Sequence, residues 1–213
     1  MVRSKTQSKS FLSPPRRPGI ALLYAEPVLW TPMMGIPDLF EALCWCVIGQ
    51  QINLTFAYRL KRRLVERYGT SITYKLQRHH FFPKPKILAQ ITIDELREMQ
   101  FSRRKAEYII GIVQQFAEEK LSKSFLANLP NKQQRLKSLI KIRGVGEWTA
   151  NYVLMKSLKQ MNCITYGDTG LQSAVFSLLN LKRKPTRKEI EDFFEPFTGW
   201  KSYLNIYLWR TLS

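Results

Sequence analysis

Ile140–Ala150, IKIRGVGEWTA, is the stretch that decides the fold. Apolar residues at helical spacing run from Leu136 to Ile142, and a helical pattern resumes at Thr149. Gly144 and Gly146 interrupt the two helices at positions that tolerate positive φ, which predicts a helix, a hairpin and a second helix. Backbone N–H groups beside the glycines can reach a phosphate, and the positive end of the second helix adds attraction. An isolated Gly-Val-Gly would also fit an ordinary turn, so the surrounding residues decide between the two interpretations.

A single acid, Asp168, follows the hairpin within Gly167–Leu171, GDTGL. Cleavage of an N-glycosidic bond develops positive charge on the sugar, and a fixed carboxylate can stabilise that charge and orient a water. Asp168 also has the sequence context of a helix N-cap, which is a structural role. The two roles are compatible, because capping holds a carboxylate in place without neutralising it.

Five segments, in this order, resemble the helix-hairpin-helix DNA glycosylase superfamily, and above all its 3-methyladenine DNA glycosylase II branch. They are Phe40–Leu43 with Ile48–Ile52, Ser102–Tyr108, the hairpin, Gly167–Leu171 and Trp200–Tyr203. The resemblance extends from about Ile36 through Ser213. It implies an all-α fold, a two-lobed helical bundle with the active cleft between the lobes, and it places the catalytic aspartate at Asp168.

The resemblance also implies an aromatic pocket for a flipped base. Trp148, Tyr152 and Trp200 match the pocket positions of the family, where aromatic faces stack on the base. A positively charged alkylated purine, such as 3-methyladenine or 7-methylguanine, would gain about 0.5–2 kcal/mol from each face. Other aromatic residues fall at helical core spacing and are predicted to be core: Tyr108, Phe193, Phe194, Tyr207 and Trp209.

The same resemblance bears on the reaction type. In lyase relatives a nucleophilic lysine stands two residues after the second hairpin glycine, where this chain has Trp148. An indole cannot form a Schiff base with the sugar, so a monofunctional enzyme is implied, in which water attacks and the strand stays intact.

DNA contacts are expected at the hairpin and at one turn of the first lobe. The predicted contact residues are Gln50, Gln51, Gly144, Gly146 and Thr149. The family places its wedge, which enters the gap left by the flipped base, just after a Gly-Gln pair, so Gln51 is the candidate. Glu147 would repel a phosphate and is expected to face solvent.

The charge of the chain favours a polyanionic partner. The sequence has 34 Lys and Arg against 16 Asp and Glu, a formal charge of +18. Nucleic acid is the first candidate, and the resemblance implies double-stranded DNA with damaged bases, bound by a monomer. A membrane surface is the competing polyanion, but the apolar runs are short and interrupted, so no membrane partner is predicted.

Cysteine and histidine usage predicts neither a metal nor another cofactor. Cys44, Cys46 and Cys163 are expected to be small buried residues in a reducing compartment, which favours the cytoplasm. No cysteine follows Cys163, so the four-cysteine iron-sulfur cluster of some helix-hairpin-helix enzymes cannot be built. His79 and His80 lack partners at ligand spacing and are expected in an exposed loop.

The chain is predicted to divide into a disordered basic arm, residues 1–19, and a glycosylase domain, residues 20–213, with the catalytic hairpin region at about 131–180. Helix starts are predicted at Pro37, Asn53, Thr92 or Asp94, Ser102, Asn131 and Thr186, with longer connections near residues 81–85 and 175–184.

Three functions are weighed. The first is a monofunctional DNA glycosylase for alkylated bases in base excision repair. The second is a helix-hairpin-helix DNA-binding or lesion-sensing module without activity. Asp168 and the aromatic residues favour the enzyme over this module. The third, an oxidised-purine glycosylase, is disfavoured by Trp148 in place of the nucleophilic lysine.

Overall fold

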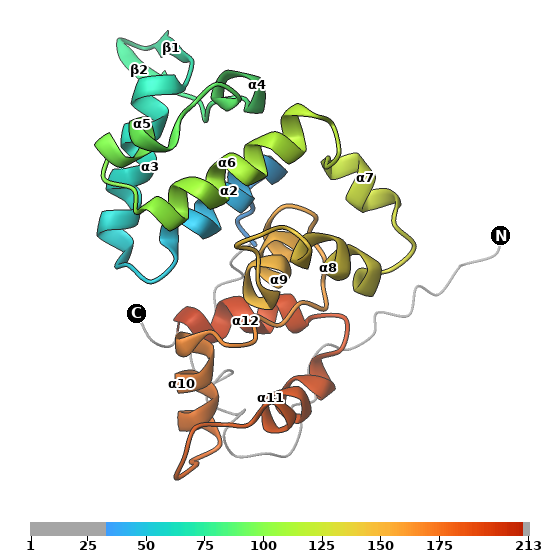
Figure 1. Ribbon diagram of the computed structural model, residues 1–213. Helices are drawn as coiled ribbons and strands as arrows, with labels where there is room; N and C mark the ends of the chain where they lie inside the picture. Colours follow the sequence, from blue (N-terminus) through green and yellow to red (C-terminus); the bar gives the residue numbers. More distant parts are fainter. Residues whose placement is uncertain (1–32, 211–213) are drawn as a thin grey trace, which may run out of the picture.

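The computed structural model describes residues 33–210, so the predicted basic arm, residues 1–19, lies outside the described part. Within that part the chain is mostly helical, as predicted, and forms two lobes (Figure 1). The elements in chain order are α2 (Leu39–Gly49), α3 (Leu54–Tyr68), β1 (Ser71–Tyr74), β2 (Gln77–His80), α4 (Pro85–Leu88), α5 (Ile93–Glu98), α6 (Arg103–Ala117), α7 (Lys123–Asn128), α8 (Lys132–Ile140), α9 (Glu147–Lys156), α10 (Thr169–Leu178), α11 (Arg187–Phe194), a 3-10 turn (Glu195–Phe197) and α12 (Lys201–Arg210).

Polar side chains start most of the helices, as the sequence predicts. The confirmed N-caps are Asn53, Thr92, Ser102, Asn131 and Thr186, each accepting a hydrogen bond from the backbone N–H three residues later. Each such cap satisfies an otherwise unpaired N–H and stabilises its helix by about 1 kcal/mol. The start predicted at Pro37 falls slightly later, because Asp38 caps α2.

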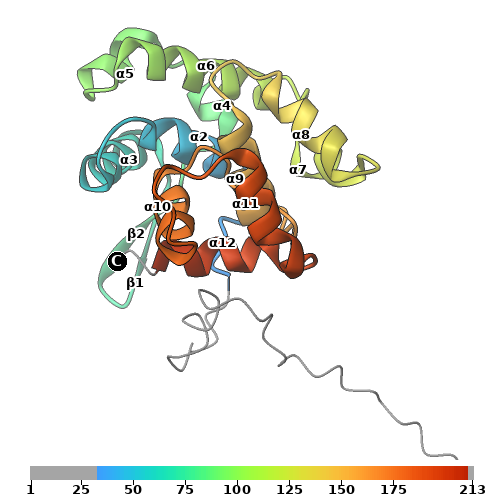
Figure 2. The same ribbon diagram turned by 90° about the horizontal axis from the view of Figure 1, so that it is seen from below.

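Each of the two lobes has its own hydrophobic core. The first joins α2 and α6 through residues such as Leu43 and Ile109, and it continues into α9 through Val153. The second lies among α10, α11 and α12, with Leu171 and Phe194 fully buried. Figure 2 shows α12 passing across the ends of α10 and α11, next to α9. The helix-hairpin-helix unit therefore belongs to the first core and meets the second lobe at its edge.

An antiparallel β-hairpin follows α3, where the sequence predicted no strand. Its pairs run from Ser71↔His80 to Tyr74↔Gln77. Lys75 and Leu76 form the tip with φ of 48° and 62°. Tight hairpin turns of this conformation strongly favour Asn-Gly or Asp-Gly, so Lys-Leu gives no turn signal in the sequence.

The connections also differ from those predicted. His79 and His80 are exposed, as expected, but they lie on β2 and not in a loop. The predicted connection at 81–85 ends early, because Pro85 is the first residue of α4. The one predicted at 175–184 begins late, because α10 continues to Leu178.

Candidate active site

Asp168 lies at the start of α10, and its carboxylate accepts three hydrogen bonds. The backbone N–H of Leu171 donates to Oδ1 at 2.8 Å, which is the predicted N-cap interaction. The indole N–H of Trp209 also donates to Oδ1, at 2.9 Å, and that of Trp148 donates to Oδ2 at 2.8 Å. All three groups are donors only, so both oxygens of the side chain accept hydrogen bonds and its orientation is fixed.

The loop before Asp168 is fixed from α12. The buried Thr165 donates its backbone N–H and its hydroxyl to Oδ1 of Asn205, both at 3.0 Å. The carbonyl of Thr165 in turn accepts the backbone N–H of Asp168 at 3.1 Å. Gly167, between them, has φ of +84°, a conformation that favours glycine. Asp168 is therefore held through both its side chain and its main chain.

Aromatic rings surround this carboxylate. The rings of Trp148 and Tyr152 stack with centroids 5.2 Å apart, and the ring of Trp209 lies 6.1 Å from that of Tyr152. The indole of Trp45 in α2 hydrogen bonds to the hydroxyl of Tyr152, and burial raises the pKa of that phenol. All four side chains are half-buried, so the group has apolar faces at the junction of the two lobes.

The structure changes two of the predicted aromatic assignments. Trp209 was predicted to be core but donates a hydrogen bond to Asp168, so it belongs to the site. Trp200 was predicted in the pocket, but it precedes α12, whereas Trp209 is near the end of that helix. Nine residues of helix separate them by roughly 13 Å along the axis, so Trp200 is not brought to Asp168. Its ring packs instead beside that of Tyr203, 5.5 Å away.

The two hairpin glycines differ in backbone conformation and in the space around them. Gly144 has φ of +90°, and a Cβ there would lie 2.4 Å from the ring of Tyr108. Gly146 has φ of −88°, so the prediction of positive φ is right for Gly144 only. A Cβ at Gly146 would meet nothing within 4 Å. Within residues 33–210, no neighbour therefore requires a glycine at this position, and the place that a Cβ would occupy is open.

Helix α9 begins at this open surface without a side-chain cap. The first N–H groups of a helix have no intrahelical partner. The N-cap residue of α9 is Gly146, which has no side chain that could accept a hydrogen bond from them. Thr149, predicted to contact DNA, is 2% exposed. Its side chain cannot serve as a DNA contact, and the hairpin offers backbone N–H groups instead.

The turn after α2 is tied to the hairpin. The side-chain amide of Gln50 donates to the carbonyl of Gly144 at 2.9 Å, so Gln50 connects the two segments within the protein. Gln51 next to it is exposed and has φ of 55°, a conformation that costs a non-glycine residue about 1 kcal/mol. The buried ammonium of Lys105 holds this turn by donating to the carbonyls of Ile48 and Gln50, and burial lowers its pKa.

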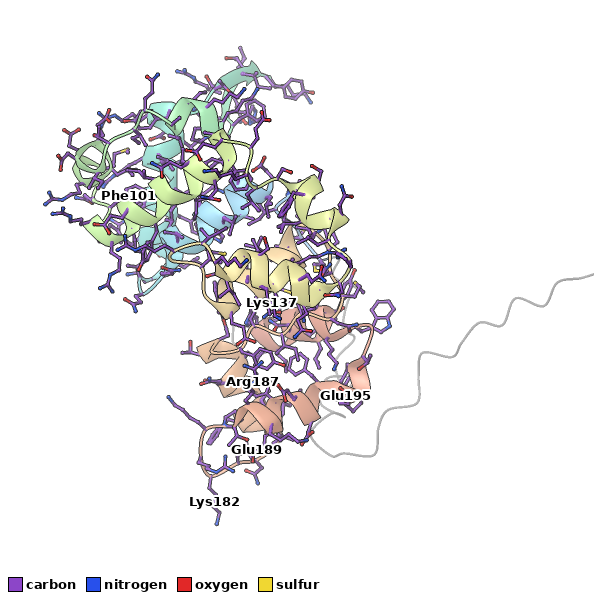
Figure 3. All side chains as sticks on the ribbon, turned by 45° about the vertical axis from the view of Figure 1, so that its right-hand side comes forward. Phe101, Lys137, Lys182, Arg187, Glu189 and Glu195 are labelled. Carbon is purple, nitrogen blue, oxygen red and sulfur yellow. The ribbon has the colours of Figure 1, made fainter. Side chains whose placement is uncertain are left out.

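The sequence predicted that Glu147 faces solvent, but in the structure its carboxylate forms an ion pair. The guanidinium of Arg187 in α11 donates to both of its carboxylate oxygens, at 2.8 and 2.9 Å. The same guanidinium lies 4.1 Å from the ring centroid of Tyr166, two residues before Asp168. Figure 3 shows Arg187 on the side of α11 nearer α9, whereas Glu189 lies on the other side. Arg187 therefore joins the start of α9 to the loop that carries Asp168.

Cys44, Cys46 and Cys163 are buried free thiols, and burial raises the pKa of Cys163 to about 11. In the described part of the chain, His, Cys, Asp and Glu side chains form no group of three or more that could hold a metal ion. Among the described helices, none is long and apolar enough to cross a membrane.

Comparisons with known proteins identify relatives over most of the chain. The model of the HhH-GPD superfamily of base excision DNA repair proteins matches residues 44–198. The DNA-3-methyladenine glycosylase of Bacillus subtilis is 44% identical in an alignment of 196 residues that covers 88% of this chain and 64% of that protein. A putative DNA-3-methyladenine glycosylase of the same organism is 36% identical over 183 residues, 86% of this chain and 62% of that protein. This chain thus spans less than two thirds of the length of these relatives.

Solved structures share the fold. The 3-methyladenine DNA glycosylase of Archaeoglobus fulgidus superposes with a TM-score of 0.70 at 25% identity, covering 81% of this chain and 57% of that one. The 3-methyladenine DNA glycosylase of Schizosaccharomyces pombe in complex with abasic DNA superposes with a TM-score of 0.74 at 20% identity, covering 91% of this chain and 90% of that one. The second likeness, at this identity, concerns the fold alone.

Proposed function

The chain belongs to the HhH-GPD superfamily of base excision DNA repair proteins, and we propose that it is a monofunctional DNA glycosylase that removes alkylated bases from double-stranded DNA. Its substrates are bases of the 3-methyladenine and 7-methylguanine class. The observation that carries the proposal is the carboxylate of Asp168, fixed by the indole N–H groups of Trp148 and Trp209 beside the aromatic ring of Tyr152.

This arrangement fits the cleavage of a bond to a positively charged base. The base leaves its stack and enters the aromatic group, where electron-rich faces attract its charge by about 0.5–2 kcal/mol each. As the bond between the base and C1′ breaks, its electron pair leaves with the base, and positive charge develops on the sugar. The carboxylate of Asp168 stabilises that charge and orients the water whose oxygen bonds to C1′; this water loses one proton to solvent and leaves a hydroxyl group on the sugar. Hydrogen bonds that hold this carboxylate in advance reduce the reorganisation needed during the reaction.

Two features support the absence of lyase chemistry and the role of DNA. Trp148 stands where lyase relatives carry a lysine, and its N–H is engaged by Asp168, so no amine nucleophile is offered there. The uncapped start of α9 and the open space at Gly146 suit a DNA phosphate that accepts hydrogen bonds from backbone N–H groups. We further propose that the protein acts as a monomer, and the three buried free thiols suit the cytoplasm.

The test is to incubate the 213-residue chain with methylated duplex DNA and to identify released bases by chromatography. We expect release of 3-methyladenine and 7-methylguanine without strand cleavage. The variant Asp168→Asn, nearly isosteric but neutral, should lose base release and keep its affinity for a duplex that carries an abasic analogue. Binding without release by the unaltered chain would instead identify a DNA-binding module, and full activity in the variant would exclude the mechanism.

A further inference from the structure

The first two turns of α6 contact both segments of the first lobe that are proposed to bind DNA. The ring of Tyr108 underlies Gly144 of the hairpin, and the ammonium of Lys105 holds the carbonyl of Gln50 in the turn that carries Gln51. The hairpin and that turn are themselves joined by the amide of Gln50. The three segments therefore contact one another.

Arg104 lies in the first turn of α6, directly before Lys105, and is exposed. The neighbouring guanidinium groups of Arg103 and Arg143 both approach the carboxylate of Glu107, at 3.4 and 3.2 Å. Arg104, in contrast, has neither a hydrogen bond nor an ion pair with any residue of the described range 33–210. Arg104 precedes Tyr108 by four residues, so the two side chains lie on the same face of α6, and the five N–H donors of its guanidinium are unused within that range.

The arrangement of the lobes indicates which DNA strand this side chain meets. Helix α6 lies on one side of the α8–α9 unit, and α10, which begins at Asp168, lies on the other (Figure 1). A flipped nucleotide has to move toward Asp168, on the α10 side. We therefore expect the strand from which it does not leave to lie on the α6 side, next to the turn that carries Gln51.

We propose that Arg104 binds the strand opposite the lesion, through acceptor oxygens of its backbone or through the edge of the base left without a partner. The proposal rests on the proposed function, because it assumes that the hairpin holds the damaged strand and that the nucleotide turns toward Asp168. A guanidinium suits both sources of acceptors, since its fixed fork of donors matches phosphate oxygens and base edges alike. Gly146 grips one strand, Gln51 fills the gap, and Arg104 holds the other strand.

The experiment compares duplex and single-stranded DNA that carry the same abasic analogue. Arg104→Gln should weaken binding of the duplex about tenfold and leave binding of the single strand unchanged. The slope of log affinity against log salt for the duplex should become shallower by about one. Arg104→Lys, which keeps the charge, should recover part of the affinity.

The matched control is Arg97→Gln. Arg97 is an exposed arginine of α5 whose guanidinium approaches Asp94, so its loss removes the same formal charge elsewhere on the lobe. We expect this control to change both affinities equally and by less than Arg104→Gln. Equal weakening of duplex and single-strand binding in Arg104→Gln, or no weakening, would overturn the proposal.

Two further arms identify the source of the acceptors and separate this proposal from the proposed function. When the base opposite the abasic analogue is omitted, a contact to the base edge is lost and a contact to the backbone is kept. Release of alkylated bases by the unaltered chain tests the proposed function alone, since the binding measurements use DNA that holds no base to release. The base-release assay can therefore refute the proposed function, and the binding assay can refute the Arg104 contact, independently of each other.

Discussion

Replacing each hairpin glycine by alanine should produce opposite effects on folding and on DNA binding. Gly144 has φ of +90° and no space for a Cβ, whereas Gly146 has φ of −88° and open space around its Cα. If Gly146 is a glycine because a phosphate approaches it, its replacement should harm binding without harming the fold. Replacement of Gly144 should harm the fold first.

The magnitudes follow from the two environments. For Gly144→Ala, the left-handed backbone costs about 1–2 kcal/mol, and the contact at 2.4 Å with the ring of Tyr108 adds about 1–3 kcal/mol. The sum, about 2–5 kcal/mol, lowers Tm by roughly 4–20 °C in a chain of this size. For Gly146→Ala, a slightly poorer N-cap and a less flexible unfolded chain nearly cancel, so stability should stay within about 0.5 kcal/mol.

The assay measures Tm and salt-dependent affinity for unmodified and abasic duplexes on the same preparations. Gly146→Ala should weaken both affinities, and Gly146→Asp should weaken them roughly 30-fold, about 2 kcal/mol, with a shallower salt slope. Both duplexes should respond, because the proposed hairpin contact is to phosphate and not to the base. Unchanged affinity in a fully folded Gly146→Asp would refute the phosphate clamp and leave the hairpin as an ordinary turn.

Three further predictions concern the site around Asp168. Trp209→Phe keeps an aromatic face but removes a hydrogen bond to a charged group, worth about 1.5–3 kcal/mol, so single-turnover base release should fall at least about tenfold; an unchanged rate would mean that only stacking matters. Arg187→Gln should slow base release several-fold with KM nearly unchanged, and adding Glu147→Gln should have little further effect; additive losses in this double-mutant cycle would contradict a shared role. Borohydride should trap no covalent complex between the unaltered chain and damaged DNA, because Trp148 replaces the amine; a trapped complex would reveal another nucleophile.

Those parts of the site that depend on nearby residues were predictable from the sequence. The helix-hairpin-helix stretch follows from the spacing of apolar residues around Gly144 and Gly146, and the cap at Asp168 follows from the four residues after it. Each of these structures is decided within about one helical turn of the residue concerned. The polar N-caps at the other helix starts have the same local origin.

What the sequence could not show depends on packing between distant segments. The spacing of Trp209 fits a core position and a pocket position equally well, and only the approach of α12 to α10 brings its indole to Asp168. The ion pair of Glu147 has its partner forty positions further along the chain, at Arg187. Trp200 was assigned from its similarity to a family position, but the rise of α12 separates it from the carboxylate. The strands were missed because Lys75 and Leu76 are atypical hairpin residues.

The start of α9 would connect the proposed DNA binding to the proposed chemistry. Gly146 provides the open surface for a phosphate, Glu147 anchors the helix to Arg187, and Trp148 orients the carboxylate of Asp168. These three consecutive residues lie within one helical turn, about 5 Å of rise. A phosphate held at Gly146 would therefore fix the position of the indole that fixes the carboxylate. DNA bound elsewhere on the protein would lack that connection, so the proposed catalysis would require the hairpin contact, which general electrostatic attraction does not supply.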